Sequence, residues 1–350
     1  MRYRNIVDSR LPRSKLVKNR GILLHFFIML TRKVLKKFSS PSIIGYIAAT
    51  IILIIIIWPD RYAKYYEYIE AKDVYDNLVP ETTSNISLER LIACEYDDII
   101  FDNDYLFTQT YRSQLFNSDE IRLGGEYTSD ECRPKFSSAI IIPYRKREEQ
   151  LHSFLIYMHN FLRKQRIHYR IFLIEQYDEK PFNRAKLFNI GYEMAIKFGF
   201  PCLILHDVDL MPMSLGQIYA CTEQPRHMCS SLDKFRYNLP YLGLFGGAVA
   251  IRTEQFKFVN GMSNLFTGWG GEDDDFYGRL KAKNIEICRF SPDFSKYIML
   301  RHGIEEPNEE RMDYLHSGPK RYHTDGLNSL KYKLVDIKLH SLFTHVLVET

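Results

Sequence analysis

The chain has 350 residues, of which 45% are hydrophobic, so it can form one large domain or two small ones around a sizeable core. Its net charge of +4 is unevenly distributed: residues 1–58 carry eleven Lys and Arg against one acid, and the remainder carries 36 basic and 42 acidic residues, a net of −6. A mildly acidic body argues against a protein that binds nucleic acid.

The first predicted element is the apolar run Ser42–Trp58, which has 17 residues, no charge, and a proline on each side. It is short for a transmembrane helix, but it is apolar all round and follows the basic pairs Arg32-Lys33 and Lys36-Lys37. A cleaved signal peptide is disfavoured because Trp58-Pro59 is a poor cleavage site. We therefore expect an uncleaved signal-anchor with a cytosolic N-terminus.

This topology divides the chain into four parts. We predict a basic cytoplasmic tail at 1–41, the anchor at 42–58, a polar stem at 59–92 and a luminal globular domain at 93–350. A short anchor suits the thinner membranes of the early secretory route, such as the Golgi. Asn85-Ile86-Ser87 in the stem is an N-glycosylation acceptor that agrees with a luminal location. A luminal body also permits disulfides, but its six cysteines allow many pairings, and the residues alone do not choose among them.

The segment 138–210 shows the clearest architecture. It reads as a buried strand at Ser138–Tyr144, a helix at 147–166, a strand at Tyr169–Glu175, a helix at Asn183–Phe198 and a strand at Cys202–Asp209. Apolar strands that alternate with helices predict an α/β fold with a parallel, doubly wound sheet. Such sheets bind ligands outside the carboxyl ends of their strands.

Asp207 and Asp209 lie at the end of the third strand. In an extended segment, side chains at i and i+2 point to the same face, so this pair suits a divalent metal that carries a diphosphate. The pattern is short, and coincidence is the ordinary explanation elsewhere in proteins. Met299 and His302 are possible further ligands, although a lone Met is usually core and a lone His usually structural.

Two other segments suggest a sugar-nucleotide site. Tyr144, Arg145 and Arg147 follow the first strand, where a ring and two guanidinium groups could bind a base and phosphates; the alternative is an ordinary basic loop. Gly268–Asp275 (GWGGEDDD) combines a glycine-rich loop, a tryptophan and four carboxylates. It predicts a movable aromatic loop that leads acidic residues into a site, or a solvated helix start.

Eight motifs together resemble the animal β-1,4-galactosyltransferase family, in order and spacing, over residues 94–345. They are IIPYRKR at 141–147, PFNRAKLFNIGY at 181–192, HDVDLMP at 206–212, QPRH at 224–227, LFGG at 244–247, GWGGEDDD at 268–275, MLRH at 299–302 and DGLNSLKY at 325–332. The resemblance implies a type II Golgi membrane enzyme with a GT-A fold, a Rossmann-like variant, that uses Mn²⁺.

The resemblance also implies residue roles. Asp209, Met299 and His302 would bind Mn²⁺. The donor would contact Pro143, Tyr144, Arg145, Arg147, Phe182, Arg184, Asp207, Val208, Leu244 and Gly246. The acceptor would contact Gly271, Glu272, Asp273, Arg311, Met312 and Leu315.

Three residues of the GWGGEDDD motif would have catalytic roles. Asp273 would be the base that deprotonates the acceptor hydroxyl, Glu272 a sugar contact and Trp269 the residue that closes over the donor. The base would act on the face opposite UDP, which gives inversion. Asp274 and Asp275 are expected to be helix-start residues. The family's two disulfides correspond to Cys94–Cys132 and Cys202–Cys221, whereas Cys229 and Cys288 have no counterpart.

One departure concerns the donor. Leu244 stands where galactose-transferring members carry Tyr, and in this family an aliphatic residue there makes room for a 2-acetamido group. We therefore expect transfer of GalNAc from UDP-GalNAc to the 4-hydroxyl of a terminal GlcNAc of a glycoprotein or glycolipid. The alternatives are UDP-Gal as donor, or an inactive membrane-anchored glycan-binding protein. A modifier subunit is left open.

Overall fold

The structure is a computed structural model that describes residues 41–57, 66–83, 91–101, 120–303 and 306–350. It contains two compact units, 1–61 and 62–350. Within the described part of the first unit, α2 (Pro41–Ile57) is a 17-residue helix with exposed isoleucines on several sides. None of the described helices is both long and apolar enough to cross a membrane. The predicted glycosylation site, Asn85, lies outside the described residues.

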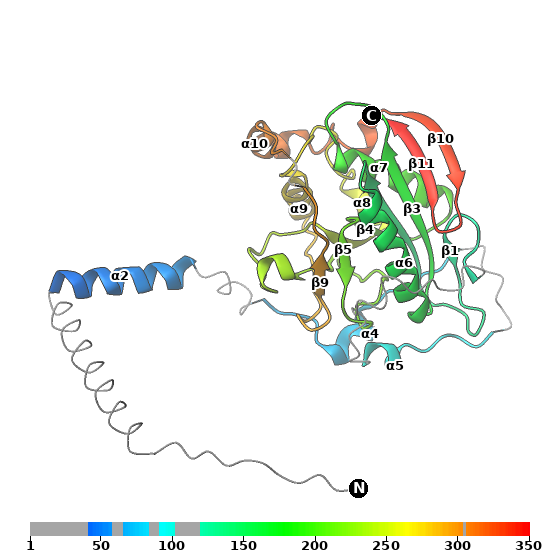
Figure 1. Cartoon of the computed structure of the whole chain (residues 1–350), viewed down its shortest axis with the longest axis horizontal. Helices are drawn as coiled ribbons and strands as arrows, with labels where there is room; N and C mark the ends of the chain where they lie inside the picture. The colour runs from blue at the N-terminus through cyan, green and yellow to red at the C-terminus, as the bar shows by residue number, and fades with distance from the viewer. Residues whose placement is uncertain (1–40, 58–65, 84–90, 102–119, 304–305) are drawn as a thin grey trace, which may run out of the picture. The chain divides into compact units, whose positions relative to one another are not determined.

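A mixed sheet forms the centre of the second unit (Figure 1). Its strands run in the order β10-β11-β3-β2-β4-β8-β6, and β1 pairs with β3. The middle strands β11, β3, β2 and β4 are parallel, whereas β10, β8, β6 and β1 pair antiparallel with their neighbours. Their bounds are β1 Glu126–Tyr127, β2 Ser137–Tyr144, β3 His168–Gln176, β4 Cys202–His206, β6 Arg226–His227, β8 Ala248–Arg252, β10 Lys333–Leu339 and β11 Thr344–Glu349.

The central strands β2, β3 and β4 are buried on both faces, as their continuous apolar sequences predict. Ile140 and Ile142 of β2 join a cluster that includes α6 (Glu148–Lys164), while Ala139 and Ile141 join a second cluster that includes α7 (Arg184–Lys197). A β-carbon added at Gly191 of α7 would lie 2.2 Å from Ile141 Cγ2, so the helix packs closely on the strand. The predicted parallel βαβαβ core is therefore present, and antiparallel strands extend it.

The remaining elements are a smaller sheet, several helices and short 3₁₀ turns. A second sheet has the order β5-β9-β7, with β5 at Leu210–Pro212, β7 at Ser231–Leu232 and β9 at Lys296–Met299. The other α-helices are α4 Val74–Asn77, α5 Asp97–Ile100, α8 Thr253–Phe258, α9 Glu272–Ala282 and α10 Arg311–Arg321. Short 3₁₀ turns are η1 Ala71–Asp73, η4 Asp233–Phe235 and η5 Leu327–Ser329.

Part of the predicted stem belongs to the body. Val74 and Leu78 are buried in the same apolar cluster as α6, and Ile69 forms a bridge with Phe290. Described residues of the predicted stem therefore pack against the domain that the sequence analysis places at 93–350. The polar, tyrosine-rich composition of 59–92 hid this, because two apolar side chains spaced four residues apart are enough to dock one helical turn.

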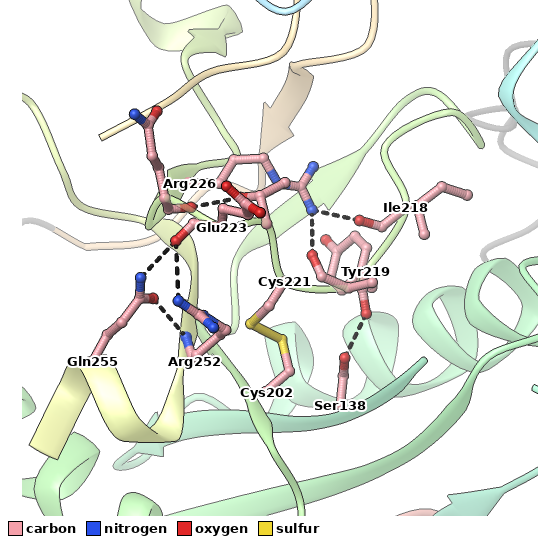
Figure 2. Close-up of a disulfide and its surroundings, with 12 residues drawn as sticks. Ser138, Cys202, Ile218, Tyr219, Cys221, Glu223, Arg226, Arg252 and Gln255 are labelled. Atoms are coloured by element: carbon pink, nitrogen blue, oxygen red, sulfur yellow. Dashed lines mark hydrogen bonds between the residues drawn. A yellow bond between two sulfur atoms is a disulfide. The ribbon is translucent and has the colours of Figure 1, made fainter. Parts of the chain in front are cut away.

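Both disulfides implied by the resemblance are present, Cys94–Cys132 and Cys202–Cys221. The second joins the first residue of β4 to a loop whose carbonyls accept hydrogen bonds from buried Arg226 (Figure 2). Cys229 and Cys288 are buried free thiols. The Cys202–Cys221 disulfide therefore fixes the amino end of β4, the end of the strand opposite to Asp207.

We predict that Leu78→Ala lowers the free energy of unfolding by about 2–5 kcal/mol, because it leaves a cavity in the core cluster. Lys72→Ala, at an exposed position of the same segment, serves as the matched control. Thermal unfolding of both variants checks this. Equal melting temperatures for the two variants would mean that the segment is a free stem.

Candidate active site

The candidate site lies at the carboxyl ends of β2 and β4, as expected for this class of sheet. Arg145 and Arg147 follow β2, and Asp207 to Asp209 follow β4. The predicted strand Cys202–Asp209 is too long, because β4 ends at His206 and Asp207–Asp209 form a turn into β5. The two aspartates therefore lie in a turn, so the alternation of side chains along an extended strand does not place them on one face.

A cavity of about 210 Å³ lies at this edge of the sheet. It gathers most of the residues predicted to bind donor and metal, from segments that are far apart in the sequence. Its lining comprises Pro143, Arg145, Arg147, Phe182, Arg184, Asp207, Val208, Asp209, Lys234, Gly268, Trp269, Glu272, Met299 and His302. Lys234 was missed by the sequence reasoning, since one lysine in a short 3₁₀ turn carries no local signal.

Arg184 connects two sides of the cavity. It is the first residue of α7, whose N-cap Asn183 accepts a hydrogen bond from the backbone N–H of Lys186. Arg184 Nε donates to Asp207 Oδ1 at 2.7 Å, and its Nη1 lies 3.4 Å from Glu272 Oε1. Burial opposes the charge of Arg184, but Asp207 and Glu272 outweigh it and raise its pKa. The guanidinium therefore compensates carboxylates from two separate elements.

The predicted metal ligands converge in the structure. Antiparallel pairing of β5 with β9 places Leu210 opposite Met299, and Leu300 N donates to Asp209 O at 2.7 Å. His302 Nε2 lies 3.0 Å from Asp209 Oδ2. Burial and the neighbouring Asp207 raise the pKa of Asp209 to about 6.

This donor set fits a divalent cation. A buried carboxylate with a raised pKa gains stability from a cation beside it, and carboxylate with imidazole suits Mn²⁺ better than thiolate sites do. No group of three His, Cys, Asp or Glu side chains with metal-site geometry occurs among the residues that the structure covers. A site here therefore depends on the thioether of Met299 or on oxygens of a ligand for its further contacts.

Glu272 begins α9, whose N-terminus follows the left-handed Gly271. Its Oε2 is buried without a hydrogen-bond partner among the described residues. An orphaned buried acceptor is costly unless a ligand satisfies it. Glu272 also lines the cavity, so this oxygen is placed to accept a hydrogen bond from a sugar hydroxyl.

Asp273 lies beside the loop that joins Tyr241 to Gly247. A β-carbon at Gly246 would come within 2.4 Å of Asp273 Oδ2, so only glycine allows this approach. Burial, followed by the charges of Glu272 and Asp274, raises the pKa of Asp273 to about 7. A carboxylate with this pKa can accept a proton near neutral pH.

Hydrogen bonds to the backbone N–H and to the backbone carbonyl of Trp269 hold its loop in place. Trp269 N donates to Glu306 O, and Asn308 N donates to Trp269 O, both at 3.1 Å. The guanidinium of Arg311 lies 5.7 Å from the Trp269 ring centroid. Flanking glycines at 268, 270 and 271 adopt positive φ, and the indole is 56% exposed. The loop thus presents a large aromatic face at the rim of the cavity.

The other predicted residues are not among those that line this cavity. Tyr144 is buried in the core, where its hydroxyl accepts a hydrogen bond from Arg147 N, and Phe182 provides the aromatic face instead. Leu244 is half-buried. Met312 is exposed and Leu315 half-buried on α10, the helix that Arg311 begins.

In the acidic run 272–275, Glu272 lines the cavity, and the last two residues have partners within the protein. All four carboxylates lie in the first turn of α9, where the helix dipole favours them. Asp275 forms a fully buried ion pair with Arg279 at 2.8 Å, and Asp274 accepts a hydrogen bond from Tyr241 at 2.9 Å. The prediction that these two are helix-start residues is therefore confirmed, with Asp275 also serving as a buried counter-ion.

We predict that Asp275→Asn lowers stability by about 3 kcal/mol, because it leaves the buried Arg279 undercompensated. Asp274→Asn, at a less buried position of the same turn, should cost below about 1 kcal/mol. Chemical denaturation of both variants measures the difference. A similar loss for the two would contradict the structural role given to Asp275.

Two family models match the chain. One describes the N-terminal region of glycosyl transferase group 7 and matches residues 98–222. The other describes the N-terminal domain of galactosyltransferase and matches residues 226–303. Together they cover both β4 with its aspartates and the GWGGEDDD motif.

Curated relatives and solved structures agree with these models. The chain is 41% identical over 279 residues to mouse beta-1,4-galactosyltransferase 1, covering 77% of this chain and 69% of the mouse protein. It is 42% identical to human beta-1,4-galactosyltransferase 4, covering 64% and 67% of the two chains.

The structural comparison points the same way. The catalytic domain of Drosophila beta-1,4-galactosyltransferase 7, solved with xylobiose, matches with a TM-score of 0.53 at 28% identity, over 61% of this chain and 93% of that one. A related Drosophila structure contains manganese, UDP-Gal and xylobiose. These similarities agree with the GT-A fold implied by the motifs, and the chain belongs to the β-1,4-galactosyltransferase family.

Proposed function

We propose that this chain is an inverting, Mn²⁺-dependent β-1,4-glycosyltransferase that moves GalNAc from UDP-GalNAc to the 4-hydroxyl of a terminal GlcNAc. The observation that carries the proposal is that three arginines, the Asp209–His302 pair and the Glu272 Oε2 that has no hydrogen-bond partner among the described residues all meet in one cavity. The related Drosophila enzyme, solved with manganese, UDP-Gal and a xylose disaccharide, provides the family precedent for a UDP-sugar donor and a sugar acceptor.

The donor side of the cavity suits a nucleoside diphosphate. Arg145 lies 5.2 Å from the Phe182 ring centroid, so a base and phosphates would meet an aromatic face and fixed cations together. Asp209, Met299 and His302 would hold Mn²⁺, which supplies Lewis-acid stabilisation of the leaving diphosphate when bound. Arg184 bridges Asp207 and Glu272 and so holds both carboxylates in place.

The acceptor side follows from α9. Asp273 would take the proton from the acceptor hydroxyl as that oxygen attacks the sugar carbon, and Glu272 would bind a sugar hydroxyl. Attack from the face opposite the departing diphosphate inverts the anomeric centre. Trp269 and its glycine-rich loop would close over the site and exclude water, which favours transfer over hydrolysis. Arg311, Met312 and Leu315 would bind the N-acetyl group of the acceptor.

The choice of donor sugar rests on Leu244. Replacing the tyrosine of galactose-transferring members by leucine leaves space for a 2-acetamido group. UDP-Gal is the second candidate, because the curated relatives are named for galactose transfer. The intact Asp209, Asp273 and His302 set weighs against a binding protein without catalysis.

The location proposed is the Golgi membrane, with the body in the lumen. The apolar helix α2 would be the core of a type II signal-anchor, and the two disulfides of the body suit an oxidising compartment.

We predict that the purified chain with Mn²⁺ and a GlcNAc glycoside uses UDP-GalNAc with a higher kcat/KM than UDP-Gal, and that Leu244→Tyr reverses this order. Product analysis by mass spectrometry and kinetics with both donors test it. Faster use of UDP-Gal by the wild type would overturn the argument from Leu244, and no transfer from either donor would refute the enzymatic function.

A further prediction concerns pH. Because the base must be ionised and its pKa is about 7, kcat should rise between about pH 6 and pH 8 and then level off. The pKa of Asp273 is higher in the folded than in the unfolded chain, so its contribution to stability is present at low pH and is lost as pH rises through about 7.

Asp273→Asn should therefore abolish transfer and increase thermal stability at pH 8 more than at pH 5. Rate profiles and melting temperatures at the two pH values measure both effects. A variant that retains transfer, or one destabilised more at pH 8 than at pH 5, would contradict the role of Asp273.

A further inference from the structure

Three buried polar side chains lie behind the loop formed by residues 241–247. They are Arg289, His227 and Cys229, and each is almost fully buried. Arg289 Nη2 donates to the carbonyls of Leu242 and Leu244, both at 2.8 Å. The side chain therefore fixes two carbonyls of this loop.

The same cluster also contacts the carbonyl of Gly246. Arg289 Nε donates to His227 Nδ1 at 3.1 Å, so the proton of the neutral imidazole is on Nε2, on the side where His227 interacts with the Gly246 carbonyl. Cys229 Sγ donates to Gly246 O at 3.2 Å and accepts from Ala248 N at 3.1 Å. The carbonyls of 242, 244 and 246 thus all point to one buried cluster.

The opposite side of the loop contacts the residues of the proposed reaction. Gly246 packs against the Asp273 carboxylate, and Gly247 O accepts a hydrogen bond from Asp207 N at 2.9 Å. Tyr241 donates to Asp274, the neighbour of Asp273. A shift of this loop would accordingly move the base and the Asp207 turn together.

Tyr66, from the N-terminal part of the body, packs on Arg289. The Tyr66 ring centroid lies 4.5 Å from the Arg289 guanidinium, and Tyr66 donates to Ile287 O at 3.0 Å. Arg289 has no carboxylate partner among the described ion pairs, so its charge is compensated by carbonyl dipoles and an aromatic face. Burying a guanidinium charge without a carboxylate costs free energy, and an apolar side chain could fill the same space without that cost.

We propose that Arg289 is a positioning residue of the transfer reaction, which acts with His227 and Cys229 by fixing the 241–247 loop against Asp273 and Asp207. The inference rests on the proposed function, because it assigns the loop to that reaction. Arg289 touches no reacting atom in this account. It sets where Leu244 and the base stand relative to the donor sugar.

Arg226 provides a matched control. It is equally buried, also lies over an aromatic ring, at 4.0 Å from the Phe290 centroid, and also donates to two carbonyls. Those carbonyls belong to Ile218 and Ala220, beside the Cys202–Cys221 disulfide (Figure 2). Arg226→Lys therefore removes comparable interactions without touching the 241–247 loop.

The test compares Arg289→Lys and Arg226→Lys in the full-length chain purified in detergent. Arg289→Lys should lower kcat by about 10–100-fold, since a displacement of about 1 Å in the reacting geometry has that effect. Its affinity for UDP with Mn²⁺, measured by calorimetry, should stay within about twofold of wild type, because the nucleotide contacts are on other elements. Arg226→Lys should lower the melting temperature to a similar extent and leave kcat within about twofold.

His227→Asn keeps an acceptor for Arg289 but loses the interaction with Gly246, so it should also lower kcat selectively; it carries the test if Arg289→Lys does not fold. Equal kcat losses for the Arg289 and Arg226 variants, or a His227→Asn variant with wild-type kcat, would overturn the inference. A wild-type chain that transfers neither sugar would instead refute the proposed function, so the two failures are distinguishable.

Discussion

The accumulation of carboxylates around one cavity is the constraint on which this structure depends. Asp207, Asp209 and Glu272 line it, and Asp273 follows Glu272 in the first turn of α9. Four like charges at this spacing repel one another, and burial adds to the cost. Arg184 offsets two of them, His302 faces a third, and the pKa of the fourth is raised to about 7. A divalent cation would compensate the remaining negative charge, so the proposed metal binding and the proposed base catalysis would share one electrostatic origin.

The fold places these charges by bringing together segments that are distant in sequence. The carboxyl ends of parallel strands supply the arginines and the Asp207 turn, and the small β5-β9-β7 sheet carries Met299 to the same edge. Antiparallel pairing of β8 with β4 then brings the 241–247 loop beside Asp207. Close packing of this loop on Asp273 requires the absence of a side chain at Gly246. The site is thus assembled by sheet register as much as by the motifs themselves.

Periodicity and apolar runs predicted the central strands and helices to within two residues, except for the carboxyl end of β4, because burial on both faces of a sheet leaves a strong local pattern. The motifs predicted most of the cavity lining. Sequence reasoning failed where tertiary contacts decide the outcome. The Asp207–Asp209 turn looked like a continuation of β4, and the docking of Val74 and Leu78 was hidden in a polar segment. The role of Arg289 was invisible, since it exists only through backbone carbonyls far along the chain.

The central claim is that the cavity binds a nucleotide sugar through a metal held at Asp209 and His302. Calorimetric titration of UDP into the purified chain, with and without Mn²⁺, tests it most directly. Mn²⁺ should raise the affinity of the wild type for UDP. Asp209→Asn should remove this gain in affinity and leave UDP binding without metal unchanged. Equal UDP affinity with and without Mn²⁺ in the wild type, or an undiminished gain in the variant, would contradict the account.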